Sequence, residues 1–573
     1  MSAVATPAPA GRRPRIAVFT GPMPTITNTA PLITSDKARR QYGLAPDPQQ
    51  GDRPDVLRPQ RLAAPVTVFI EAFSAHPLEQ DASALYAPPD GYLDAAGRFS
   101  VTEPAGGGRP VHRVELRPED GLYLLPYMAR RADGRPWDAA ALEDGAAPAR
   151  TRQTFLPDAS RLYEEIERFG LENDGRGVRL RSLADFDFFR AAPGSGWTGG
   201  RAADRRTDRG AGDIPPETLG ADYFPYEPAH LARIPDLATL ARITNQVQQA
   251  ADSGLYRGLQ WLESSATIEE SLYWFNLVID TRFPIVGHAA HRTHGAVSPD
   301  GPKNITDGVK YLTSRVWSGP DGADRIGAVL VTDELVFTAR EVAKTDARPG
   351  GYVAAGGHGG VVADLGAHWA PQLTFVPNRL HTHTSALRLP LLPGTVRGVR
   401  GRLGAGRTIQ VRTKDEGGLL RPETMPVVRL EGFGHFIDTG APGIGPVPPD
   451  VELIDRIEQL LAASELPGLV VEGLAPYGST DPARDAALRA AVFGGVAVVR
   501  TGRGHPGGMT YRGDRWSIAG NNLTATKARI LLRAALLRLG ALPVAADPFA
   551  PTLREEADTA AALAAYQNIF DTH

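Results

Sequence analysis

The 573-residue sequence contains no cysteine, which excludes a disulfide framework, a thiolate nucleophile and a zinc site with cysteine ligands. It has no apolar run of the roughly 18 residues that a membrane-spanning helix requires, so we expect no membrane partner. Its 62 Lys and Arg residues nearly balance 65 Asp and Glu residues, and the net charge of -3 disfavours a nucleic acid as partner. The first residues lack the apolar core of a signal peptide, which predicts a cytoplasmic protein.

The sequence does contain short apolar runs that alternate with amphipathic segments. RIAVFT at 15–20 and the run at 66–72 have the composition of buried strands that end in loops. Residues 237–250 show a helical pattern before the next apolar run. Alternation of this kind predicts an α/β fold, and the length of the chain allows more than one hydrophobic core.

The final third repeats the alternation more strongly. A helical pattern in ELIDRIEQLLAAS is followed by the strand-like LPGLVVEGL, and a second pair follows in DAALRAAVFGG and VAVVRTG. The helical LTATKARILLRAALLRLG comes last. Parallel βαβ units with glycine at the turns predict a small doubly wound domain.

The segment from Trp261 to Thr313 is similar to the central segment of the bacterial L-asparaginase/glutaminase family. The family reads H-G-T-D-T, M-E-E-T-x-Y-F, P-V-V-x-x-G-A-M-R and S-x-D-G-P-x-N-L in that order. This chain has ESSAT at 263–267, IEESLYWF at 268–275, PIVGHAAHR at 284–292 and SPDGPKNI at 298–305. The V-V-R-T-x-R and L-T-x-x-K-A-R-x-L-L motifs of its final third also resemble the family.

The resemblance implies a two-domain architecture, with a larger N-terminal mixed-sheet α/β domain and a smaller flavodoxin-like parallel α/β domain. It implies an amidohydrolase that releases ammonia through a threonine acyl-enzyme, with a small-molecule amide as substrate and without metal or organic cofactor. It also implies a homotetramer built from close dimers. The expected divisions are a flexible leader at 1–14, an N-terminal domain at 15–390, a linker at 391–424, a C-terminal domain at 425–545 and a tail at 546–573.

An insertion is expected within the N-terminal domain, at about 79–227. The segment is rich in turn-forming sequences such as PAGGGRP and GWTGGRAADRRTDRGAGD, and the family has no counterpart for it. Two interpretations stay open: a surface decoration, or a lid over the active site.

Three predicted site residues follow the first two apolar runs. The family nucleophile corresponds to Thr25 in the loop TGPMPTI, where nearby backbone N–H groups can stabilise an oxyanion. Tyr42 corresponds to a tyrosine that assists the nucleophile, and Ser74 to a serine that binds the substrate carboxylate. Each also has an ordinary structural explanation, as a turn former, an apolar contact or a cap.

The 263–267 turn departs from the family motif. Ser265 and Thr267 retain hydroxyl groups, so Ser265 is a second candidate nucleophile, but Ala266 replaces the aspartate that binds the α-ammonium group of the substrate. Glu263 replaces a histidine; it is either a base or ammonium anchor, or a strand-end residue that faces solvent or pairs with an arginine.

The family also has a lysine that activates a nucleophile. Counting along the frame from Asn304 places this position on Arg315, a group that stays protonated and can stabilise an oxyanion or carboxylate but cannot act as a base. The later segment EVAKTDARPGGY resembles the K-T-x loop of asparaginases. The EGLAPYGST loop near 472–480 is either a contribution of Tyr477 and Ser479 to a neighbouring subunit's site or a simple turn.

Metal binding is not expected. His288, His291 and His294 lack an H-E-x-x-H pattern, and His381 and His383 have no carboxylate close in sequence.

Three hypotheses for the function remain: an asparaginase-type hydrolase, a hydrolase of an amide or lactam without a free α-ammonium group, and an inactive binding protein.

Overall fold

A computed structural model gives the architecture of the chain. It describes residues 13–21, 32–34, 55–57, 59–60, 66–70, 89–96, 98–116, 123–124, 163, 166, 180–192, 196–202, 223–224, 227–228, 235–292, 298–354, 359–365, 370–434, 449–503, 510 and 514–573.

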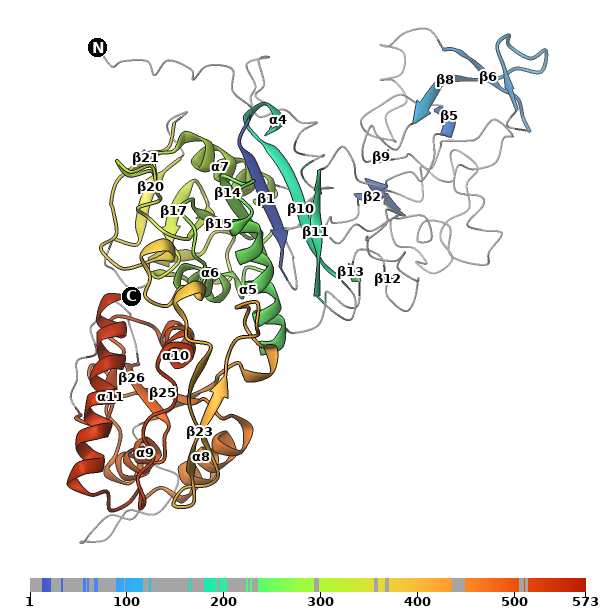
Figure 1. Ribbon diagram of the computed structural model, residues 1–573. Coiled ribbons are helices and arrows are strands. Elements are labelled where there is room, and N and C mark those ends of the chain that lie inside the picture. The colour runs from blue at the N-terminus through green and yellow to red at the C-terminus, as the bar shows by residue number, and fades with distance from the viewer. Residues whose placement is uncertain are drawn as a thin grey trace.

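A nine-stranded mixed sheet forms the centre of the N-terminal part (Figure 1). Its strands, in spatial order, are β11 (Gly196–Ala202), β10 (Asp185–Ala192), β1 (Arg15–Thr20), β14 (Gly258–Leu262), β15 (Ile285–His288), β16 (Val329–Thr332), β17 (Leu335–Thr338), β20 (Val361–Asp364) and β21 (Gln372–Leu373). The five strands from β10 to β16 are parallel, and the flanking strands pair antiparallel. The carboxyl ends of the parallel strands therefore meet at one edge, called here the carboxyl edge.

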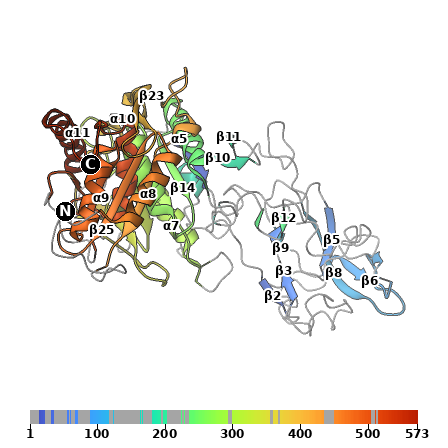
Figure 2. The same ribbon diagram turned by 90° about the horizontal axis from the view of Figure 1, so that it is seen from below.

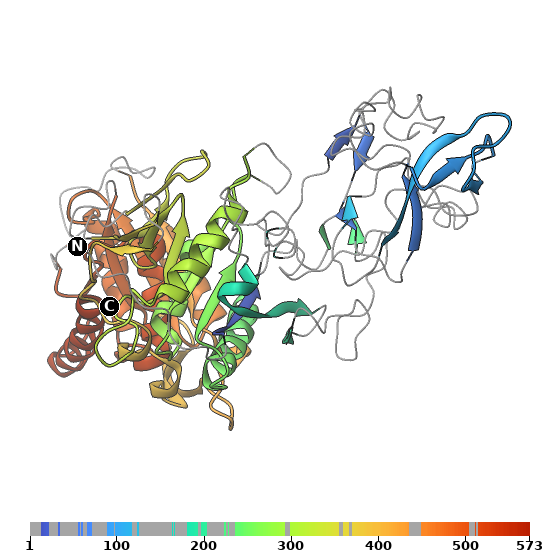
Figure 3. The same cartoon turned by 90° about the horizontal axis from the view of Figure 1, so that it is seen from above.

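Helices cover both faces of this sheet. Strand β1 shows the division, because Ala17 and Phe19 join one hydrophobic cluster while Ile16 and Val18 join the other. The first cluster contains α5 (Leu237–Asp252) and α6 (Ile268–Val278); the second contains α4 (Leu180–Leu183) and α7 (Gly301–Ser314). In Figure 3, the view from above, α7 is the long yellow-green helix that lies along the sheet.

A smaller parallel sheet forms the C-terminal part. It consists of β24 (Val427–Gly432), β25 (Pro467–Gly473), β26 (Ala497–Gly502) and β27 (Ile518–Ala519). Its helices are α8 (Val451–Ala463), α9 (Pro482–Phe493), α10 (Ala525–Leu539) and α11 (Leu553–Thr572). Figure 2 shows these elements from below. The predicted α/β fold, with a larger mixed-sheet part and a smaller parallel part, is confirmed.

Two segments differ from their expected roles. Residues 391–424, expected as a linker, contain the hairpin of β22 (Thr395–Arg400) and β23 (Arg407–Arg412), which buries Val396 and Val411 against Leu466. The expected tail ends in the 20-residue helix α11, whose first turn has a capping box formed by Thr552 and Glu555. Both segments are thus part of the packed structure.

The expected insertion contains a core strand. Strand β10, at 185–192, pairs in parallel with β1, whereas β5 (Val66–Ile70) belongs to a separate sheet with β8 (Arg109–Leu116), β6 (Gly91–Leu93) and β7 (Phe99–Ser100). The run at 66–72 therefore forms a strand, as expected, but this strand is not part of the nine-stranded sheet. Both runs are apolar and strand-like, and which one pairs with β1 depends on long-range contacts that the local pattern does not contain.

Four short pairs complete the described strands: β2 (Leu32–Thr34) with β3 (Asp55–Leu57), β4 (Pro59–Gln60) with β9 (Tyr123–Leu124), β12 (Tyr223–Phe224) with β13 (Glu227–Pro228), and β18 (Val342–Lys344) with β19 (Tyr352–Ala354). Among the described helices, none combines the length and apolar character that crossing a bilayer requires.

Candidate active site

The 263–267 turn lies at the carboxyl edge, between β14 and α6. The end of β1 is beside it, because Gly21 N donates a hydrogen bond to Leu262 O over 2.7 Å. A Cβ atom on Gly21 would lie 2.7 Å from the Trp261 ring and 3.2 Å from Glu263 Cγ. Glycine is thus required for this close approach of β1 to the turn.

The turn is closed by its own backbone. Ser264 O accepts hydrogen bonds from Thr267 N at 3.2 Å and Ile268 N at 3.1 Å, which lead into the first turn of α6. Ser265 and Thr267 are half-buried, and Ala266 is exposed. The Thr267 hydroxyl donates to Glu263 Oε1 over 3.0 Å, so this side chain is already engaged within the turn.

Glu263 is buried, with 2% of its surface exposed. Its Oε2 accepts a hydrogen bond from Trp261 Nε1 at 2.7 Å, and burial raises the pKa of its carboxyl group to about 7. It does not face solvent, and no basic side chain in the described part of the chain forms an ion pair with it. A carboxyl group with such a pKa can hold or release a proton near neutral pH.

The hairpin of β18 and β19 brings a lysine to the turn. Tyr352 Oη donates a hydrogen bond to Ser265 O over 3.0 Å, and the Lys344 ammonium group lies 4.9 Å from the centroid of the Tyr352 ring. The Lys344 backbone N–H donates to Glu269 Oε2 over 2.8 Å, at the start of α6. Lys344 therefore contacts Tyr352, which binds the turn, and Glu269, which follows the turn in α6.

The ammonium group of Lys344 is held by backbone carbonyl groups. Its Nζ donates to Arg348 O at 2.7 Å and to Gly350 O at 2.5 Å. Burial lowers the pKa of Lys344, while Asp346 and Asp300 oppose that effect. The signal for this residue was present in EVAKTDARPGGY, but counting from Asn304 had placed the family lysine elsewhere.

Arg315 lies away from the turn. Helix α7 runs antiparallel to the strands: Asn304 Nδ2 donates to Ala289 O, just after β15, whereas a Cβ on Gly258, at the amino end of β14, would lie 2.8 Å from Leu312. Arg315 ends α7 at that opposite edge, exposed and with a φ of 58°. The assignment of the family lysine position to Arg315 does not agree with this placement, since Lys344 of the later hairpin, and not Arg315, lies near the turn.

Asp300 is a further carboxylate at the carboxyl edge that the sequence did not indicate. It precedes α7 and accepts hydrogen bonds from His291 N at 2.9 Å and Arg292 N at 2.8 Å. Burial raises the pKa of Tyr352, and the charges of Glu269 and Asp300 add to that rise. Asp300 thus acts electrostatically on the same tyrosine and lysine that adjoin Ser265.

Three predicted residues, Thr25, Tyr42 and Ser74, lie outside the described residues, and their roles stay predictions. Tyr477 is 60% exposed in the loop after β25, and Ser479 is exposed beside it. Their contribution to the site of a second copy also stays a prediction, as does the homotetramer. The mass of the assembly in light scattering would test the homotetramer.

The residues at this edge match a known protein family. Residues 234–359 match the family model for the asparaginase N-terminal domain, and this range includes the 263–267 turn, Lys344 and Tyr352. This segment belongs to the asparaginase family. The resemblance of the segment from Trp261 to Thr313 is thereby confirmed.

Two curated relatives and one solved structure are similar to this chain at low identity. Glutaminase-asparaginase of Acinetobacter glutaminasificans is 30% identical over 109 residues, covering 19% of this chain and 30% of the relative. L-asparaginase 2 of Bacillus subtilis strain 168 is 27% identical over 111 residues, covering 19% and 28%. The matched segment thus spans less than a third of either relative. A probable cytoplasmic L-asparaginase from Campylobacter jejuni superposes with a TM-score of 0.41 and 17% identity, over 60% of this chain and 88% of that structure.

Proposed function

We propose that the protein is an asparaginase-type amidohydrolase that hydrolyses a small-molecule amide and releases ammonia at the carboxyl edge. The observation that carries the proposal is the position of Lys344 beside the Ser265 turn, fixed through Tyr352 and Glu269. A lysine whose pKa is lowered by burial can take a proton from a hydroxyl nucleophile, which an arginine cannot do.

The proposed reaction has two steps. A hydroxyl oxygen attacks the amide carbon, its proton passes to the lysine, and the amide nitrogen leaves as ammonia after it is protonated. Water then attacks the resulting ester, which releases the carboxylic acid and restores the hydroxyl. Thr25 is the nucleophile implied by the family resemblance, and Ser265 is the alternative in the turn itself.

Ammonia release tests the proposal. Wild type would be assayed with asparagine, glutamine and α-N-acylated amides, beside Lys344→Met, Thr25→Ala and Arg315→Met. We expect Lys344→Met to lower kcat by about 10²- to 10⁴-fold, the usual contribution of an acid–base group. Arg315→Met also removes a cation, but at the opposite edge, and should retain wild-type activity.

Two outcomes would contradict the proposal. Equal activity of Lys344→Met and wild type would remove Lys344 from the mechanism, even if the protein is an amidohydrolase. Absence of turnover on every amide, in folded wild-type protein, would instead favour the inactive binding protein.

The turn also bears on the substrate class, because Ala266 offers no carboxylate to an α-ammonium group. We propose that the preferred amide has no free α-ammonium. Since Ala266 is exposed, Ala266→Asp should be tolerated. We expect it to raise kcat/KM for asparagine relative to an N-acylated amide by about tenfold, equivalent to one charge-assisted hydrogen bond. An unchanged ratio, measured by ammonia release, would reject this choice of substrate.

A further inference from the structure

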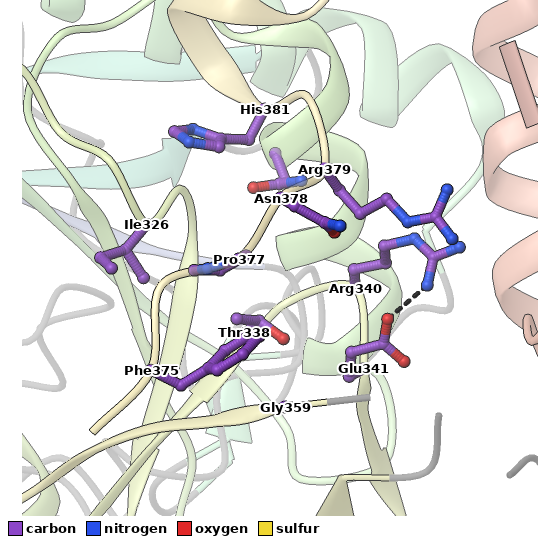
Figure 4. A pocket seen from close by; sticks show the side chains of 11 residues that line it. Ile326, Thr338, Arg340, Glu341, Gly359, Phe375, Pro377, Asn378, Arg379 and His381 are labelled. Carbon is purple, nitrogen blue, oxygen red and sulfur yellow. Dashed lines mark hydrogen bonds and ion pairs between the residues drawn. The ribbon is translucent and has the colours of Figure 1, made fainter. Parts of the chain in front are cut away.

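A cavity of about 330 Å³ lies in the N-terminal part, away from the 263–267 turn (Figure 4). Thr338, one of its lining residues, pairs with Val329 at the amino end of β16. Thr332, at the carboxyl end of the same strand, pairs with Leu335. The cavity therefore lies beside the amino edge of the parallel strands, whereas the candidate active site lies at the carboxyl edge.

Two arginines give this cavity its charge, and Figure 4 shows their guanidinium groups extending side by side. The side chain of Arg340 is 5% exposed; its Nη1 forms an ion pair with Glu341, and its Nε donates to His573 O over 2.6 Å. Its Nη2 makes no well-formed hydrogen bond within the described part of the chain, and the Tyr273 hydroxyl, itself without one there, lies near this guanidinium group. Arg379 donates from Nη1 to Asp571 O.

The positive charge is only partly compensated by the cavity lining. Burial lowers the pKa of Arg379, and the neighbouring Arg340 lowers it further, as expected for two like charges held close together. Glu341 is the single carboxylate among the lining residues, and its Oε2 accepts from Asn522 Nδ2 at 3.0 Å. Burial lowers the pKa of His381 to about 4, so this ring is neutral at pH 7. The lining side chains thus sum to a charge of about +1, and Asp571, just outside the lining, opposes the lowering of the Arg379 pKa.

The remaining lining combines a free hydroxyl group with apolar surface. Thr338 Oγ1 is buried and lacks a hydrogen-bond partner among the described residues. Ile326, Phe375 and Pro377 supply apolar contacts, and 42% of Phe375 is exposed. A bare inorganic anion would leave this apolar wall without a contact.

We propose that the cavity binds a small organic carboxylate. Its carboxylate group would accept hydrogen bonds from Arg340 Nη2, Arg379 and the Thr338 hydroxyl, and its apolar portion would contact Phe375. Guanidinium groups match carboxylate oxygens in geometry and charge, and a buried, unpaired N–H group is costly unless a ligand or water satisfies it. The volume far exceeds the roughly 30 Å³ of one water molecule and suits a ligand of about ten heavy atoms.

Isothermal titration calorimetry on the full chain tests the proposal with 3-phenylpropanoate as probe. The neutral 3-phenylpropanamide and inorganic phosphate serve as comparison ligands. We expect saturable binding of the carboxylate to one site, and no saturable binding of the amide. Arg379→Gln should weaken carboxylate binding by about tenfold or more, because it removes a charged donor. Arg400→Gln, an exposed arginine of the β22–β23 hairpin, should bind like wild type.

Three further variants separate the alternatives. Phe375→Ala should weaken 3-phenylpropanoate but not phosphate. Lys344→Met should bind the carboxylate like wild type; loss of binding there would place the ligand at the candidate active site and overturn the proposal. Arg379→Lys keeps the charge and provides a second measurement if Arg379→Gln does not fold.

The proposal is also overturned if wild type shows no saturable binding, or if Arg379→Gln and Phe375→Ala both bind as wild type does. Phosphate binding as tight as carboxylate binding, with no effect of Phe375→Ala on either, would show a site for inorganic oxyanions instead. None of these results depends on whether the carboxyl edge hydrolyses amides.

Discussion

Glu263 is the residue where burial and protonation are most directly connected. Its carboxyl group is enclosed between Trp261 and Thr267, and both side chains donate hydrogen bonds to it. These bonds favour the charged form, but burial outweighs them, and the pKa rises from 4.5 to about 7. The folded state therefore binds the proton more tightly than the unfolded state does.

This shift predicts how stability depends on pH. Between about pH 4.5 and 7, Glu263 is protonated in the folded state and ionised in the unfolded state, so its contribution to stability is lost as the pH rises. The loss should amount to about 3 kcal/mol, and Glu263→Gln, which resembles the protonated form, should abolish it. Urea unfolding of wild type and variant at pH 5 and pH 8 would measure the difference. An equal change in both proteins would contradict the assignment.

At the scale of an element, α7 spans the sheet from the carboxyl edge to the amino edge. Asn304 joins its beginning to the carboxyl edge, and Leu312 joins its end to the amino edge. Between them, Gly308 faces His288, and a Cβ atom at this position would lie 2.1 Å from His288 Cε1. The helix can approach β15 so closely only because residue 308 has no side chain.

Gly308→Ala should therefore destabilise the protein. In an exposed helix the same change is stabilising by roughly 0.5–1 kcal/mol, but here the added methyl group overlaps a buried ring, and we expect a loss of about 1–3 kcal/mol. Thermal unfolding would show this as a lower Tm. Thr313→Ala, a half-buried position on the same helix, is the control, with an expected change below about 1 kcal/mol. A raised Tm for Gly308→Ala would show that α7 does not pack as described.

For the whole molecule, Lys527 connects the two parts of the chain. It lies on α10 of the C-terminal part and is 2% exposed, yet its Nζ donates at 2.6 Å both to Glu269 O and to Ala339 O of the N-terminal part. Burial lowers its pKa to about 8, so it remains mostly charged at pH 7. Glu269 also binds the Lys344 backbone, so α10 contacts the helix turn that positions the proposed catalytic lysine.

Lys527→Met should weaken this connection. The variant keeps the apolar length of the side chain but leaves two buried carbonyl groups without their donor, and we expect a loss of about 2 kcal/mol in the free energy of unfolding. Arg529 lies on the same helix as Lys527 and forms a partly exposed ion pair with Glu270 of α6. Arg529→Met removes this pair and should cost less than about 1 kcal/mol. Calorimetry of both variants would compare them. Equal effects would mean that the buried lysine does not stabilise the interface.

The sequence by itself determined the local features: strand β1, the order of elements from β14 to α7, and the alternating elements of the C-terminal part, because period, turn residues and short motifs are local. It also indicated the 263–267 turn. Tertiary structure alone decided that β10 rather than β5 adjoins β1 and that Glu263 is buried. It also decided between Lys344, whose segment EVAKTDARPGGY already resembled the family's loop, and Arg315. Pairing, burial and the meeting of distant segments depend on contacts between residues far apart in the chain, and no spacing within one segment contains them.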